Sequence, residues 1–136
     1  HRQRRPSTWL TVEEPLKPAM AIKDHGLDCD VIMLDCLTFL IGNLMFEEEQ
    51  ENGTHPRIKI HSKVMNHVNR LVEAISETRS HVVIVSNEVG LTLVSDNNLG
   101  RQFQELVGLA NQKIAGIADE AYLVVAGYPI VLKDRR

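Results

Sequence analysis

Two short apolar runs, each followed at once by polar side chains, constrain the fold more than any other feature of the chain. Val31–Leu34 lies between two aspartates, and Val82–Val85 opens into the polar segment Ser86–Gly90. Uninterrupted apolar runs of this length are typical of strands that are buried on both faces of a parallel sheet. We therefore expect both runs to be strands of a mainly parallel sheet that is covered on each side.

Helical spacing of apolar residues marks the segments that follow these runs. Three stretches carry it: residues 37–45, 60–75 and 99–117. A shorter helix is expected over Leu16–His25, because Gly26 follows in the position where glycine ends many helices. Tyr122–Gly127 and Ile130–Leu132 are expected to be two closing strands. The alternation of strands and helices predicts an α/β fold.

The length and composition suit a single domain over residues 1–136. A chain of 136 residues with 43% hydrophobic residues is large enough to bury a core. The polar segment Glu47–Pro56 is expected to be a surface loop that turns at Asn52–Gly53.

Charge and cysteine content exclude several classes of protein. The net charge of −3 argues against a nucleic-acid binder, which would show a basic surface. The longest apolar stretch, Val31–Phe46, is interrupted by Asp35 and Asn43, so no membrane span is expected. Two cysteines, Cys29 and Cys36, are too few for a disulfide framework and favour a reducing cytoplasm.

The carboxyl ends of the two predicted strands mark a candidate site. Ligands of open α/β sheets bind beyond these ends, so Asp35 and Ser86–Glu88 are expected to share one crevice. An aspartate in this position orients the metal of phosphate-loop nucleotide hydrolases, but many strand-end aspartates only start a turn or cap a helix. The phosphate-loop pattern G-x-x-x-x-G-K-[ST] does not occur in the sequence. Either such a loop lies upstream of His1, or the domain does not bind a triphosphate in that way.

The sequence begins with a histidine among arginines: His1, Arg2, Arg4 and Arg5. A neutral imidazole can attack the α-phosphorus of a nucleotide, and arginines can stabilise the charge that builds on the phosphoryl oxygens. A solvated chain end has the same composition, so these residues alone leave both interpretations open.

Several short motifs follow one another in order along almost the whole chain. They are His1–Pro6, Trp9–Pro15, Asp35–Thr38, Asn43–Leu44, Ser86–Gly90, Leu99–Phe103, Gly108, Asn111–Gln112 and Ala118–Gly127. Together they resemble the bifunctional adenosylcobinamide kinase/adenosylcobinamide-phosphate guanylyltransferase family of cobalamin biosynthesis. The phosphate loop and first two strands of that family precede the histidine and have no counterpart in this sequence.

The resemblance implies a RecA-like P-loop NTPase three-layer fold, a homotrimer and a two-step activity. The family phosphorylates adenosylcobinamide and then transfers GMP from GTP through a guanylylated histidine, which would be His1. GTP or ATP would be the substrate nucleotide and Mg²⁺ would assist. The positions that the resemblance assigns to guanine-nucleotide contact are Arg2, Gln3, Arg4, Arg5, Glu13 and Asp35.

Two alternatives remain at this stage. The chain could be a truncated and inactive remnant that serves only as a structural or oligomerising domain. It could also be another P-loop ATPase, in which Asp35 serves hydrolysis.

Overall fold

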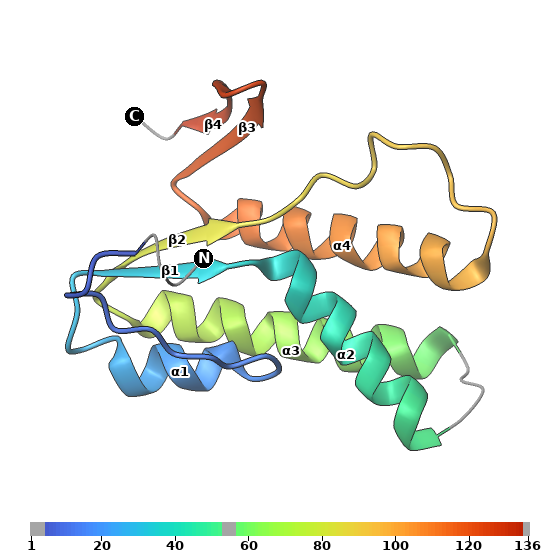
Figure 1. Cartoon of the computed structure of the whole chain (residues 1–136), viewed down its shortest axis with the longest axis horizontal. Helices are drawn as coiled ribbons and strands as arrows, with labels where there is room; N and C mark the ends of the chain where they lie inside the picture. The colour runs from blue at the N-terminus through green and yellow to red at the C-terminus, as the bar shows by residue number, and fades with distance from the viewer. Residues whose placement is uncertain (1–4, 53–56, 135–136) are drawn as a thin grey trace.

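The computed structural model describes residues 5–52 and 57–134, and these residues form an α/β fold as predicted (Figure 1). The elements, in chain order, are α1 (Pro18–His25), β1 (Val31–Asp35), α2 (Leu37–Asn52), α3 (Arg57–Glu77), β2 (His81–Val85), α4 (Asn98–Ile117), β3 (Glu120–Val125) and β4 (Tyr128–Asp134). None of the described helices has both the length and the apolar character that a bilayer crossing requires.

Strands β1 and β2 pair in parallel, which confirms the prediction for the two apolar runs. Their register sets Val31 opposite His81 at one end and Asp35 opposite Val85 at the other. The last residues of the two strands therefore lie at the same edge of the sheet, and the segments that leave them start side by side (Figure 1).

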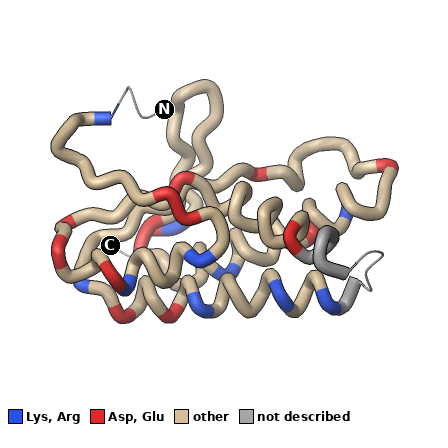
Figure 2. Tube along the Cα trace, turned by 60° about the horizontal axis from the view of Figure 1, so that its bottom comes forward, with Lys and Arg blue, Asp and Glu red and all other residues tan. Residues whose placement is uncertain are grey.

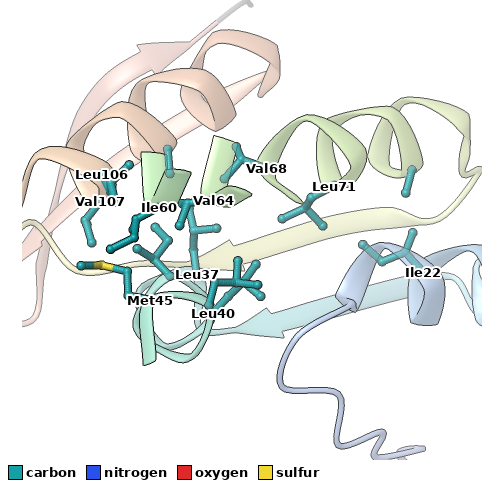
Figure 3. Packing of buried hydrophobic residues seen from close by; sticks show 14 residues of the cluster. Ile22, Leu37, Leu40, Met45, Ile60, Val64, Val68, Leu71, Leu106 and Val107 are labelled. Carbon is teal, nitrogen blue, oxygen red and sulfur yellow. The ribbon is translucent and has the colours of Figure 1, made fainter. Parts of the chain in front are cut away.

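One continuous core fills the space between the helices and one face of this sheet (Figure 3). The largest fully buried side chains come from α2, α3 and α4: Leu37, Ile41, Leu44, Val64, Val68, Leu71, Leu106 and Val107. Ile32 and Leu34 of β1 and Ile84 of β2 pack against this cluster. Most of the periodic apolar positions of the predicted helices thus build the core, whereas Leu99 and Ile117 are exposed.

The second face of the β1–β2 sheet differs from the expectation. Val31 and Met33 are 56% and 50% exposed, and Val83 and Val85 are 45% and 41% exposed. The prediction that both faces are buried is therefore wrong for this part of the chain. An apolar run shows that both faces of a strand are apolar, whereas burial depends on which elements pack there.

The polar segment after Phe46 also differs from the expectation, because α2 continues to Asn52. The predicted loop over Glu47–Pro56 is wrong for Glu47–Asn52, while residues 53–56 lie outside the described residues. Glutamate and glutamine are good helix formers, so a polar composition did not prevent the helix from continuing. Glu47 also forms an ion pair with Lys63 of α3 at 3.0 Å, which ties the two helices together.

The two closing strands pair with each other as an antiparallel hairpin and do not join the β1–β2 sheet. The hairpin turns at Ala126 and Gly127, whose φ angles of 51° and 84° are both positive. Tight hairpin turns of this kind suit the right-handed twist of the strands and favour glycine. Lys133 of β4 donates hydrogen bonds to the carbonyl oxygens of Ala115 and Gly116, which fastens the hairpin to the end of α4.

Candidate functional site

Thr38 lies at the centre of the edge where β1 and β2 end. It belongs to the first turn of α2 and is only 9% exposed. Its hydroxyl oxygen accepts hydrogen bonds from the backbone N–H of Asn87 at 2.9 Å and from Asn87 Nδ2 at 3.2 Å. It also lies 3.3 Å from Ser86 Oγ. These contacts show that the segments following the two strands lie against each other, as the parallel pairing predicted.

Asn111 of α4 holds the other side of this segment. Ser86 Oγ donates a hydrogen bond to Asn111 Oδ1 at 2.6 Å, and Asn111 Nδ2 donates one to the Asn87 carbonyl oxygen at 3.1 Å. The chain after β2 is therefore fixed on one side by α2, through Thr38, and on the other side by α4. Such a network holds a loop rigidly, because each polar group has a partner that would be costly to lose.

Asp35 and Arg5 meet next to this network. Arg5 Nη2 lies 3.8 Å from Asp35 Oδ2, and the side chains are 33% and 45% exposed. Two of the side chains that the resemblance assigned to nucleotide contact are thus brought together across 30 positions of sequence. An ion pair that is so open to water adds little to stability, so either partner can exchange the contact for a ligand.

The other predicted positions are placed as follows. Glu13 is exposed in the segment that leads to α1. Its neighbour Glu14 accepts hydrogen bonds from the N–H groups of Lys17 and Leu16, and these bonds lower the pKa of the Glu14 carboxyl group. Glu14 therefore shapes the entry to α1. The positions outside the described residues are His1, Arg2, Gln3 and Arg4.

Along α3 the basic residues Lys59, Lys63 and Arg70 precede the acidic residues Glu73 and Glu77, so basic and acidic side chains lie toward opposite ends of this helix (Figure 2). Within residues 5–52 and 57–134 no three His, Cys, Asp or Glu side chains come together as a metal-binding group. Asp35 is a single carboxylate at the edge of the sheet. One carboxylate is nevertheless enough for Mg²⁺ that is held mainly by substrate phosphates and water.

An open hollow of about 580 Å³ lies between α2 and α4, beside Thr38 and Asn87. Phe39, Phe46 and Phe103 line much of it. Sequence reasoning missed this feature, because the helical stripe was interpreted only as core. A signal was present in the spacing of Phe39 and Phe46, which lie seven positions apart and therefore on one face of a helix.

Replacing Thr38 by valine is expected to lower the free energy of unfolding by about 1 to 3 kcal/mol, because the Asn87 N–H loses its acceptor in a part-buried place. Urea denaturation of the two proteins would measure the difference. Serine keeps the hydroxyl, so Thr38→Ser should lose much less. Equal losses in both variants would show that the methyl group, and not the hydrogen bond, is what matters.

Comparison with known proteins gives consistent results. The family model described as cobinamide kinase / cobinamide phosphate guanyltransferase matches residues 1–132. The bifunctional adenosylcobalamin biosynthesis protein CobU of Salmonella typhimurium is 32% identical over 135 residues, which are 98% of this chain and 75% of that protein. CobU of Escherichia coli is 30% identical over 135 residues, with the same coverage of both chains. The bifunctional adenosylcobalamin biosynthesis protein CobP of Pseudomonas aeruginosa is 31% identical over 133 residues, covering 98% of this chain and 70% of that protein. The sheet edge with Asp35, Thr38 and Asn87 thus lies in a chain that belongs to the cobinamide kinase / cobinamide phosphate guanyltransferase family.

Proposed function

We propose that the protein phosphorylates adenosylcobinamide and then transfers GMP from GTP to the resulting phosphate. The observation that carries this proposal is the pairing of Arg5 with Asp35 at the carboxyl edge of the parallel sheet, in a member of this family. Ligands of open α/β sheets bind at this edge. A RecA-like P-loop fold is part of the same proposal.

His1 is the proposed nucleophile of the guanylyl transfer. Its neutral imidazole attacks the α-phosphorus of GTP, a nitrogen–phosphorus bond forms, and pyrophosphate leaves. A phosphate oxygen of cobinamide phosphate then attacks the same phosphorus, and the imidazole leaves with the electron pair of the broken bond. A covalent intermediate of this kind divides one difficult substitution into two easier ones.

Arg5 and Asp35 act on the nucleotide in this scheme. The guanidinium of Arg5, with those of Arg2 and Arg4, stabilises the negative charge on the phosphoryl oxygens during each substitution. Asp35, with Gln3 and Glu13, contacts the guanine nucleotide. Bound Mg²⁺ would supply further charge stabilisation at the phosphates, and the Asp35 carboxylate would hold it.

The activity can be tested with the natural polypeptide, adenosylcobinamide, GTP or ATP, and Mg²⁺. The expected products are cobinamide phosphate and then GDP-cobinamide with pyrophosphate, which chromatography with mass detection resolves. Incubation with GTP alone should add the mass of one GMP to the protein. A protein that gains no adduct and shows no thermal shift with GTP would match the inactive remnant instead. Turnover of ATP without any change in cobinamide would match another ATPase.

Replacing Asp35 by asparagine is expected to slow GMP transfer by roughly ten- to a hundredfold, since a contact to a charged group is lost. Stability should change by less than about 1 kcal/mol, because the pair with Arg5 is solvent-exposed. Steady-state kinetics and thermal melting would measure both effects. Asp28→Asn, at an exposed acid before β1, is the matched control and should change neither. Similar rates for Asp35→Asn and Asp28→Asn would refute the role of Asp35.

The homotrimer that the resemblance implies belongs to this proposal, as does a cytoplasmic location. Light scattering of the purified protein should give the mass of three chains.

A further inference from the structure

We propose that the hollow between α2 and α4 binds the corrin ring of cobinamide. This inference rests on the proposed function, because it assigns a place to one of the two substrates. The corrin ring is a broad, largely apolar macrocycle with methyl groups and primary amide arms around its rim. Its chemistry therefore differs sharply from that of a nucleoside triphosphate.

The walls of the hollow suit an apolar ring. Phe39 is 73% exposed and Phe46 is 61% exposed, on the same face of α2. Phenylalanine is usually among the buried residues, and exposed apolar patches mark binding surfaces more often than isolated apolar side chains do. Phe103 of α4 faces the same space from the other side. The volume of about 580 Å³ is within the range of small-molecule sites.

Gly42 lines the hollow and, because it has no side chain, leaves its space unfilled. It lies between Phe39 and Phe46 on the lining face of α2. A Cβ atom at this position would meet only Phe103 Cε2, at an ordinary contact distance of 3.8 Å. A larger side chain would therefore project into the hollow without colliding with the backbone.

The polar groups of the hollow match amide arms rather than phosphates. None of the described residues that line it is charged, whereas a triphosphate site needs cations or a row of free N–H groups. Asn43 is held by a hydrogen bond from its Nδ2 to the Pro15 carbonyl oxygen at 3.1 Å. Asn87 is held by Thr38. For both amides no described residue donates to Oδ1, so each carbonyl oxygen can accept from a primary amide of the ligand.

The position of the hollow suits the reaction. Thr38 and Asn87 are among the residues that line it, and they also form the network at the carboxyl edge of the sheet. Asp35 lies three residues before Thr38, at the end of β1. A ring held between α2 and α4 can therefore extend its hydroxyl-bearing arm toward the edge where the phosphate groups are proposed to bind.

The test measures binding of adenosylcobinamide to the natural polypeptide by equilibrium dialysis, with the corrin absorbance as the readout. In the double variant Phe39→Ala/Phe46→Ala the Kd is expected to rise at least about tenfold, because two exposed apolar contacts are lost. Gly42→Leu should also weaken binding at least about tenfold by filling the hollow, and it should keep the helix, since leucine is the better helix former. Tyr128→Ala, at an aromatic residue that is 77% exposed in the hairpin, is the control and should bind normally.

Two further measurements distinguish corrin binding from nucleotide binding and from contacts between copies of the chain. The Kd for GTP should stay within about twofold in all variants, and light scattering should give an unchanged oligomeric mass. Unchanged affinity for cobinamide in both hollow variants would overturn the proposal. An equal loss of GTP affinity would assign the hollow to the nucleotide instead, and a change of oligomeric mass would assign it to contacts between copies of the chain.

If the unaltered protein converts cobinamide and the hollow variants do so equally well, this inference fails while the proposed function stands. If the unaltered protein neither binds nor converts cobinamide, both fail.

Discussion

Replacing His1 by alanine is expected to lower the rate of GMP transfer roughly a thousandfold or more, while phosphorylation of cobinamide continues. Removing a covalent nucleophile eliminates the route through the intermediate, and losses of this size are typical of such residues. Phosphorylation does not pass through the imidazole in the proposed scheme, so it should be retained. Separate assays for cobinamide phosphate and GDP-cobinamide would measure the two steps, and intact-mass spectrometry should show no GMP adduct.

His81→Ala is a suitable control for this experiment. His81 is an exposed histidine at the amino end of β2, opposite the edge that carries Asp35. Its replacement should leave the adduct and both activities in place. If His1→Ala reduces the two activities equally, or if the protein still acquires GMP, then His1 is not the nucleophile.

Replacing Leu71 by alanine is expected to lower the free energy of unfolding by about 3 to 5 kcal/mol. Leu71 of α3 is fully buried in the core that joins the helices to the sheet, so the truncation removes apolar contacts and leaves a cavity. Figure 3 shows the side chain within this cluster. Urea denaturation monitored by circular dichroism would give the difference.

Leu93→Ala applies the same truncation at a site that is 93% exposed. It should change the free energy of unfolding by no more than about 0.5 kcal/mol. Comparable losses at the two leucines would mean that the α3 core does not control stability. A loss at Leu71 alone would support the core described for this chain.

The features predictable from sequence were those that follow from local pattern. The apolar runs predicted β1 and β2, and the parallel pairing then required Asp35 and Ser86 to lie at one edge. Helical spacing predicted α3 and α4, because the residues at that spacing, such as Leu71 and Leu106, are the ones that the core buries. These predictions depend on periodicity, which is a property of the chain itself.

The features that could not be predicted in this way depend on tertiary packing, that is, on which elements cover a given face of a strand or helix. Nothing in Val31 or Met33 indicates whether a helix covers them, and both are exposed. The pairing of Arg5 with Asp35 joins positions far apart in sequence, and only the family resemblance linked them. The hollow was missed because Phe39 and Phe46 fit a helical pattern in either environment. Whether such residues are buried or line an open space is decided by the spacing of α2 and α4.

The β3–β4 hairpin affects how the protein unfolds locally. It is a pair of strands with exposed apolar side chains on both, including Val124 at 63% and Leu132 at 65%, and such a pair is only marginally stable by itself. The helical core can remain intact when the hairpin separates, so backbone amides of β3 and β4 should exchange with solvent water through local fluctuations, far faster than those of α3. The chain is therefore expected to behave as two cooperative units, with Lys133 and its bonds to the end of α4 at the boundary between them.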